Sequence, residues 1–195
     1  AFSDAGEDVL VRNAMAYSKP FVAETMAELE QAGATEIVLL PMYPQYSTAT
    51  TESVFNDVRQ SAKKWQVAPK LHFVNDLFTE PAFIRAWTSR INSFLEQESI
   101  DHVVFSYHGV PEKTIKKADK AQVCKFGSCC QQITDSNRYC YRMQCVQTTE
   151  AIVKSLGWDK DKYSFAFQSR FGPLPWLQPY LDEHLSNLVK SGVKR

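Results

Sequence analysis

The chain has 195 residues, 44% of them hydrophobic and 12% aromatic, enough to bury the core of one large domain or two small ones. Basic and acidic residues both number 22, so the formal net charge is zero, which argues neither for nor against a nucleic-acid partner; we expect none. No apolar stretch approaches the roughly 20 residues that span a bilayer. Residues 1–8 are too polar for a signal peptide. We therefore expect a cytoplasmic location, with peripheral membrane contact left open.

Strand-like and helix-like segments alternate along the chain. The expected helices cover residues 20–33, 51–62, 81–94, 145–156 and 181–188, and the expected strands cover 37–40, 71–74, 102–106 and 163–168. The continuous apolar run at 37–40 predicts a strand that is buried on both faces. Repeated strand–helix units predict an α/β fold with a parallel sheet covered by helices on both faces. We expect a domain boundary near residue 77, whereas the strand order is not readable.

We expect the chain to be truncated at both ends. The first residue is not Met, and residues 192–195 (GVKR) resemble residues 33–36 (GATE), which lead into a predicted buried strand. We therefore expect further chain beyond residue 195, beginning with another strand.

Three loops that follow predicted strands have an unusual composition. They are PMYPQYSTATT (41–51), SYHGVP (106–111) and FQSRFGPLPWLQP (167–179). In open parallel sheets, ligands bind beyond the carboxyl ends of the strands. The loops supply aromatic and polar groups suited to a large planar ligand with acidic edges: Tyr43, Tyr46, Phe171 and Trp176, with Ser47, His108, Ser169 and Arg170.

Each of these features also has an ordinary explanation. Aromatic loops usually pack against the protein, a histidine after a strand is more often structural than catalytic, and proline and glycine form turns. Without a known pattern, the residues predict no more than a small-molecule enzyme with its site at three strand ends.

Together, however, the three loops resemble those of the ferrochelatase family, in the right order and over essentially the whole chain. The resemblance implies two similar Rossmann-like (chelatase-type) domains with parallel sheets, residues 1–76 and 77–195, both partial, with porphyrin held in the cleft between them. It implies a lyase that inserts Fe²⁺ into protoporphyrin IX to give protohaem, the final step of haem biosynthesis.

The resemblance also assigns the site residues. His108 matches the catalytic histidine, which either accepts pyrrole protons or ligates the incoming iron, and both roles stay open. Arg170 would face a porphyrin propionate, where a guanidinium offers a fixed charge. The remaining matches are porphyrin-lining or nearby positions: Tyr17, Tyr43, Tyr46, Ser47, Ser169 and Trp176.

Two departures from the family pattern affect activity. The family usually has arginine before the tyrosine of the first motif, where this chain has Ala16. The acidic residue that faces the catalytic histidine in the family belongs to a segment beyond Arg195. We therefore expect residues 1–195 alone to be inactive and the full-length protein to be active.

All five cysteines fall between residues 124 and 145. This chain has an insertion there, at about 116–141, where typical relatives have a short acidic loop. The spacing lacks the paired C-x2-4-C knuckles that are typical of zinc. Four thiolates from one insertion suit a [2Fe–2S] cluster, and some bacterial ferrochelatases resemble this chain in carrying one here. We expect Cys124, Cys129, Cys130 and Cys140 as ligands. Cys145 falls on the apolar face of the next helix, and we expect it to be a buried structural thiol.

The cluster would serve structure or sensing, because metallation transfers no net electrons. A zinc site and free thiols are the alternatives for the cysteines. The alternatives for the whole protein are a coproporphyrin ferrochelatase, another tetrapyrrole metal chelatase, or a non-catalytic sensor that binds tetrapyrrole or iron. The oligomeric state and the protein that delivers iron are not readable from the sequence.

Overall fold

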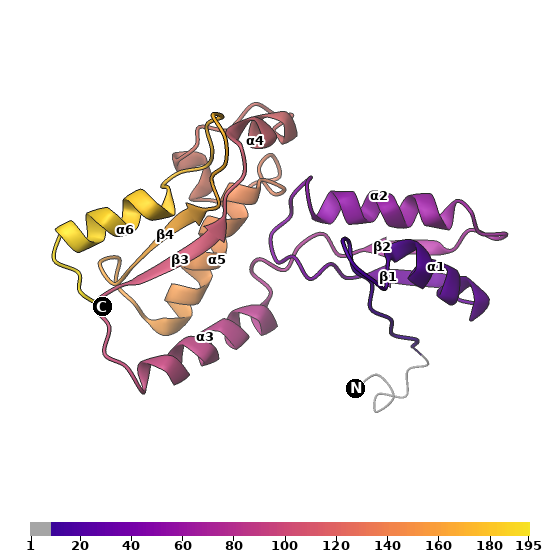
Figure 1. Cartoon of the computed structure of the whole chain (residues 1–195), viewed down its shortest axis with the longest axis horizontal. Helices are drawn as coiled ribbons and strands as arrows, with labels where there is room; N and C mark the ends of the chain where they lie inside the picture. The colour runs from indigo at the N-terminus through magenta and orange to yellow at the C-terminus, as the bar shows by residue number, and fades with distance from the viewer. Residues whose placement is uncertain (1–8) are drawn as a thin grey trace. The chain divides into compact units, whose positions relative to one another are not determined.

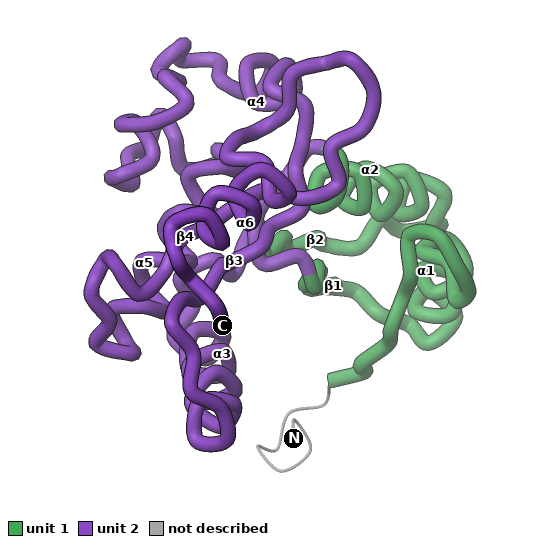
Figure 2. The backbone as a smooth tube through the Cα atoms, turned by 60° about the vertical axis from the view of Figure 1, so that its left-hand side comes forward, with its two compact units in different colours: residues 1–42, 49–75 green, residues 43–48, 76–195 purple. Residues whose placement is uncertain are grey.

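The computed structural model describes residues 9–195 and divides the chain into two compact units (Figure 2). Unit 1 comprises residues 1–42 and 49–75, and unit 2 comprises residues 43–48 and 76–195. Residues 1–8, which carried the argument against a signal peptide, lie outside the described residues. Both units combine parallel strands with helices, so the predicted α/β class is confirmed. Their equivalence to two chelatase domains that meet near residue 77 stays a prediction.

Unit 1 contains helices α1 (Val22–Gln31) and α2 (Thr51–Ala62) and strands β1 (Glu36–Leu39) and β2 (Lys70–Phe73). The two strands pair in parallel, with Ile37 opposite Leu71. Alternate strand side chains join the two helices in one hydrophobic core. This core includes Val22, Met26, Leu29, Ile37, Leu39, Val54, Val58, Ala62, Trp65, Leu71 and Phe73.

The expectation that the first strand is buried on both faces is wrong for the structure as described. Ile37 is 9% exposed, whereas Val38 is 69% exposed and Leu40 is 50% exposed. Successive strand residues point to opposite faces. Because α1 and α2 pack in the same core as Ile37 and Leu39, they leave the face that carries Val38 uncovered.

Unit 2 contains α3 (Pro81–Leu95), β3 (Val103–His108), α4 (Glu112–Ala118), the 3₁₀ turn η2 (Ser128–Cys130), α5 (Tyr141–Leu156), β4 (Tyr163–Gln168) and α6 (Leu181–Lys190). Strands β3 and β4 pair in parallel, from Val103 with Tyr163 to His108 with Gln168. The predicted start of α3 at Pro81 is confirmed, as is the end of α5 at Gly157, which has the left-handed φ of +67° favoured in a glycine cap. Helix α4 was not predicted.

Helices cover both faces of the sheet in unit 2, as expected (Figure 1). On one face, Phe165 and Phe167 of β4 pack in a cluster with Cys145 of α5. Just before them in the strand, Ser164 points the opposite way and its Oγ lies 2.7 Å from Nε2 of His184 on α6. This alternation places α5 and α6 on opposite sides of β4.

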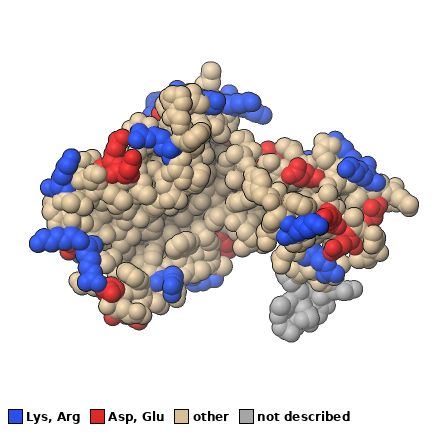
Figure 3. Space-filling model, in the orientation of Figure 1, with Lys and Arg blue, Asp and Glu red and all other residues tan. Residues whose placement is uncertain are grey.

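Within residues 9–195, no helix is both long enough and apolar enough to cross a membrane. Figure 3 shows Lys and Arg side chains interspersed with Asp and Glu over the visible face, in keeping with a formal net charge of zero. The surface seen there offers no single-sign field to steer a charged partner.

Candidate active site

His108 is the last residue of β3, at the carboxyl edge of the unit 2 sheet. The strand runs two residues beyond its predicted end at 106, so the histidine belongs to the strand rather than to the loop. The His108 side chain is exposed, and among the described residues its imidazole makes no hydrogen bond. Its backbone carbonyl accepts a hydrogen bond of 2.8 Å from the hydroxyl of Tyr141, the first residue of α5.

The loop after His108 is joined to the loop after β4 by backbone hydrogen bonds. The N–H of Gly109 donates to the Gln168 carbonyl at 2.8 Å, and the N–H of Leu177 donates to the Val110 carbonyl at 3.0 Å. A Cβ atom at Gly109 would lie 3.3 Å from Cε3 of Trp176. The structure therefore brings the histidine loop and the tryptophan loop together, as parallel pairing of β3 with β4 requires.

The first predicted loop contributes residues 43–48 to unit 2, where α5 holds them. The N–H of Tyr46 donates to Oε1 of Gln144 at 2.6 Å, and Nε2 of Gln45 donates to Oγ1 of Thr148 at 3.0 Å. The Tyr46 ring packs edge-to-face on Tyr139, with ring centroids 5.3 Å apart. Nearby in the loop, Ser47 is buried and Tyr43 is half-buried.

Gln144 and Thr148 are functional-site supports that the sequence analysis missed. Gln144 is 0% exposed and Thr148 is 2% exposed, one helical turn apart on α5. The Gln144 amide also donates to the Arg138 carbonyl at 2.7 Å, and Thr148 donates to the Phe78 carbonyl at 2.8 Å. The available signal was the i, i+4 spacing of two polar side chains that flank Cys145 on the predicted apolar face.

A buried carboxylate completes the surroundings of Gln144. Asp76 accepts a hydrogen bond of 3.4 Å from the Gln144 amide and pairs with Arg138 at 3.6 Å. Burial raises the pKa of Asp76, and the opposing charge of Arg138 acts in the other direction.

Three further predicted site residues have other surroundings. Arg170 pairs with Asp182 at 3.5 Å and with Glu183 at 3.3 Å, and its guanidinium stacks 4.0 Å from the centre of the Tyr180 ring. Ser169 is exposed and has a left-handed φ of +69°. Tyr17 belongs to unit 1 and is 84% exposed, so it is not among the residues that unit 2 brings together.

The four cysteines expected as cluster ligands gather in one region of unit 2 as free thiols. Direct thiol interactions link Cys130 with Cys140 and Cys124 with Cys129, while the sulfurs of Cys129 and Cys130 lie 4.0 Å apart. The adjacent Cys129 and Cys130 belong to the 3₁₀ turn η2, which follows Gly127. The thiols thus form two pairs.

Donor groups surround these sulfurs. The N–H of Lys125 donates to Sγ of Cys129 at 3.2 Å, and the Arg142 guanidinium donates to Sγ of Cys130 at 3.1 Å. The neighbouring Cys130 thiol lowers the pKa of Cys140, helped by amide groups in the first turn of α5. Interaction with Cys140, together with burial, raises the pKa of Cys130.

Cys145 packs in the hydrophobic core of unit 2. It is 0% exposed and lies in a cluster with Ile115, Phe167 and Leu177. Burial raises the pKa of its thiol. The burial expected for this cysteine is therefore observed.

A single metal ion and a two-iron cluster make different demands on the cysteines. Among residues 9–195, no three His, Cys, Asp or Glu side chains converge closely enough to hold one metal ion. A two-iron cluster has a different requirement, because each iron takes two cysteine thiolates. Hydrogen-bond donors reach the sulfurs of Cys129 and Cys130, but the cluster expected from the sequence stays a prediction.

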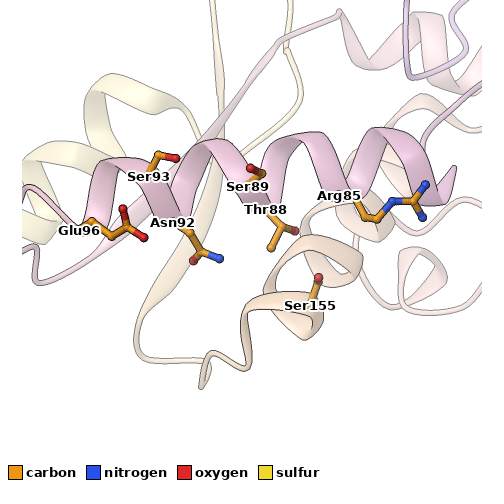
Figure 4. Close-up of a pocket in the computed structure, with 7 residues that line it drawn as sticks. All are labelled: Arg85, Thr88, Ser89, Asn92, Ser93, Glu96 and Ser155. Carbon is orange, nitrogen blue, oxygen red and sulfur yellow. The ribbon is translucent and has the colours of Figure 1, made fainter.

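A cavity of about 430 Å³ lies elsewhere in unit 2, between α3 and α5 (Figure 4). It is lined by Arg85, Thr88, Ser89, Asn92, Ser93, Glu96 and Ser155. None of the predicted site residues lines this polar cavity, and it offers no aromatic wall for a planar ligand.

An exposed imidazole and a tryptophan loop are joined at the carboxyl edge of parallel strands in an α/β protein, the edge at which ligands bind in folds of this class. Residues 1–195 match the family described as Ferrochelatase, and the chain belongs to that family. It is 36% identical over 193 residues to a ferrochelatase of Coxiella burnetii (strain Dugway 5J108-111), covering 97% of this chain and 53% of the relative.

Two further relatives show the same extent of similarity. "Ferrochelatase 2" of Shewanella oneidensis is 35% identical over 97% of this chain and 52% of the relative. A ferrochelatase of Legionella pneumophila (strain Corby) is 34% identical over 92% of this chain and 53% of the relative. The chain thus spans about half the length of the curated relatives it matches.

Proposed function

We propose that the protein to which this chain belongs is a ferrochelatase, a lyase that inserts Fe²⁺ into protoporphyrin IX in the last step of haem biosynthesis. One observation carries the proposal. In a chain of this family, His108 stands exposed at the end of β3, and its loop is hydrogen-bonded to the loop that carries Trp176. All five cysteines are free thiols, the state that a reducing compartment such as the cytoplasm maintains.

Metallation of a porphyrin requires two pyrrole protons to leave while the metal enters. An exposed imidazole with no hydrogen bond among the described residues is available to accept a proton or to ligate the substrate iron. His108 is therefore the proposed catalytic residue. The rings of Trp176 and Tyr46 supply flat apolar surfaces for the macrocycle. We propose Tyr17, Tyr43, Ser47 and Ser169 as the remaining porphyrin-binding residues.

Arg170 is the proposed contact for a propionate. Its present partners, Asp182 and Glu183, are well-exposed carboxylates at the start of α6. Exposed ion pairs of this kind contribute about 0–1 kcal/mol. A propionate can therefore replace one of them at little cost and form a bidentate pair with the guanidinium.

We further propose that Cys124, Cys129, Cys130 and Cys140 bind a [2Fe–2S] cluster. The two thiol pairs, the Arg142 guanidinium beside Cys130 and the Lys125 amide beside Cys129 support this assignment. When bound, the cluster cross-links the thiolates and carries net negative charge, which nearby donors stabilise. Because metallation transfers no net electrons, the cluster contributes structure or sensing rather than catalysis.

Iron-dependent disappearance of free porphyrin in the full-length protein tests the catalytic proposal. We expect His108→Ala to lower turnover by at least roughly 100-fold, within the usual contribution of general acid–base catalysis. His102→Gln is the matched control. His102 precedes the opposite end of β3, and its ring is engaged by Ser164 and the Asp161 carbonyl. Full activity of His108→Ala would refute the assignment.

The same assay separates the alternatives. Ala16, in place of the usual arginine, favours a non-catalytic sensor as the second candidate. A protein that binds porphyrin and iron but forms no haem would establish the sensor. Preference for coproporphyrin as ring, or for cobalt or nickel as metal, would establish another chelatase.

Visible absorption of the purified protein tests the cluster. We expect a brown protein that Cys140→Ser bleaches, because the change removes one ligand of a pair. Cys145→Ser should stay coloured, since Cys145 packs with Ile115 and Leu177 in the hydrophobic core. Equal bleaching by both substitutions would contradict the ligand assignment.

A further inference from the structure

Two tyrosine rings form an aromatic pair beside the start of α5. The rings of Tyr46 and Tyr139 meet edge-to-face, with ring centroids 5.3 Å apart and ring planes at 61°. Tyr46 belongs to the loop of residues 43–48 in unit 2, and Tyr139 lies two residues before α5. Because the two planes are inclined, a planar ligand that lies flat on one ring meets the other ring with its rim.

We propose that Tyr139 is a further porphyrin-contacting residue, set beside Tyr46 by the buried amide of Gln144. This inference rests on the proposed function, in which Tyr46 lines the porphyrin site. It adds a side chain from the insertion at about 116–141, to which the resemblance assigned no porphyrin contact. Gln144 is a positioning residue, because it is 0% exposed and acts only through the two tyrosines.

The aromatic pair lies at the same end of unit 2 as the proposed catalytic histidine. Tyr141, two residues after Tyr139, donates its hydroxyl to the backbone carbonyl of His108 at 2.8 Å. His108 is the last residue of β3, so the start of α5 lies at the carboxyl edge of the sheet. Ligands of open parallel sheets bind at this edge.

Tyr139 has surface left to offer a ligand. It is 49% exposed although its ring packs on Tyr46, and its hydroxyl makes no hydrogen bond among the described residues. Tyr46 is half-buried. A macrocycle that covers the exposed part of the Tyr139 ring removes apolar area from water, which favours binding.

Gln144 holds the main chain at both members of the aromatic pair. Its Oε1 accepts the N–H of Tyr46 at 2.6 Å, and its Nε2 donates to the Arg138 carbonyl at 2.7 Å. Arg138 directly precedes Tyr139, so this carbonyl belongs to the peptide group that leads into Tyr139. A single side-chain amide therefore sets the two tyrosine backbones relative to each other.

The surroundings of Gln144 fix the orientation of its amide. Nε2 also lies 3.4 Å from Oδ2 of Asp76, whose carboxylate pairs with the Arg138 side chain at 3.6 Å. The reversed orientation would set the amide oxygen against the Arg138 carbonyl and the Asp76 carboxylate, and the amide nitrogen against the N–H of Tyr46. Only the observed orientation satisfies all of these groups.

Protoporphyrin binding to the full-length protein, followed by porphyrin fluorescence, tests the contact. We expect Tyr139→Ala to raise Kd about tenfold with kcat for metallation within about twofold, because the ring touches the macrocycle and not the iron. Tyr139→Phe keeps the ring and should bind within about twofold of wild type. Tyr163→Ala is the matched control. It removes a ring that packs edge-to-face on Phe105 at the amino end of β4, and it should leave Kd within about twofold.

Substitution of Gln144 tests the positioning role. Gln144→Met has a side chain of similar size but loses both hydrogen bonds, and we expect it to raise Kd at least about threefold with kcat within about twofold. Combined with Tyr139→Ala, it should raise Kd by less than the product of the two single effects. Thr149→Val removes a buried hydrogen bond to Tyr107 from the same helix and should leave Kd within about twofold. A general loss of stability would therefore not reproduce the result.

Each part of the inference has its own contrary result. An unchanged Kd in Tyr139→Ala, or an equal rise in Tyr139→Phe or Tyr163→Ala, would overturn the contact. Fully multiplicative effects of Gln144→Met and Tyr139→Ala would overturn the positioning role. A wild-type protein that binds no porphyrin would instead overturn the proposed function, so the failures are distinguishable.

Discussion

Substitution of Gly109 by alanine tests how tightly the histidine and tryptophan loops fit. A Cβ atom there would lie 2.8 Å from the Gln168 carbonyl oxygen and 3.3 Å from Cε3 of Trp176. Ordinary contact begins near 3.4 Å, so the Cβ and the carbonyl must separate by roughly 0.6 Å. The same carbonyl accepts the N–H of Gly109, so any separation lengthens that hydrogen bond as well.

The expected cost follows from overpacking. Adding a methyl group to a filled site costs about 1–3 kcal/mol. At roughly 2–4 °C per kcal/mol for a chain of this size, a cost of about 2 kcal/mol lowers the melting temperature by about 4–8 °C. Since displacement of a catalytic group by about 1 Å can cost 100-fold in rate, we expect turnover to fall by at least roughly tenfold.

Thermal unfolding and porphyrin metallation by full-length Gly109→Ala measure the two effects. Gly33→Ala is the control, because Gly33 has a left-handed φ of +77° and no atom within 4 Å of its Cβ position. We expect the control to lose about 1–2 kcal/mol through backbone strain alone and to keep wild-type turnover. Wild-type stability and turnover in Gly109→Ala would refute the reasoning.

Two further predictions concern the half-buried His184 and the buried Thr51. Burial, and then the charge of His102, lower the pKa of His184 below its ordinary 6.5. As the pH falls through about 6.5, the unfolded chain therefore binds this proton before the folded protein does, and the free energy of unfolding decreases. Denaturant titrations from about pH 8 to 5 should show this decrease, and a His184→Gln variant with the same dependence of unfolding free energy on pH would contradict it. Thr51, at the start of α2, has a buried hydroxyl without a hydrogen-bond partner among the described residues. Thr51→Val should therefore raise the free energy of unfolding by about 1 kcal/mol, whereas Thr51→Ser should not. Urea unfolding of both variants measures the difference.

The helix ends were predictable because their causes are local. Pro81 at the first turn of α3 and Gly157 after α5 act through their own backbone preferences. The exposure of Val38 was not predictable in this way. A continuous apolar run is the same whether helices cover one face of a strand or both, and only the placement of α1 and α2 decides.

In the candidate site, too, some features follow from local sequence and others only from the fold. Loop composition marked the residues at the strand ends, and the parallel pairing of β3 with β4 then brings the His108 and Trp176 loops together. The roles of Gln144 and Thr148 depend on which segments approach α5, and the i, i+4 spacing of the two side chains does not identify those segments. The ion pairs of Arg170 with the first turn of α6 likewise arise only when β4 and α6 are in place.

The buried amide of Gln144 restricts which residue can occupy its position. Its oxygen accepts from Tyr46, while its nitrogen donates to the Arg138 carbonyl and to Asp76. An amide combines donor and acceptor in one plane, whereas a carboxylate can only accept. A glutamate at this position would therefore set a new anion against Asp76 and lose the donor that reaches the Arg138 carbonyl, although it could still accept from the Tyr46 amide.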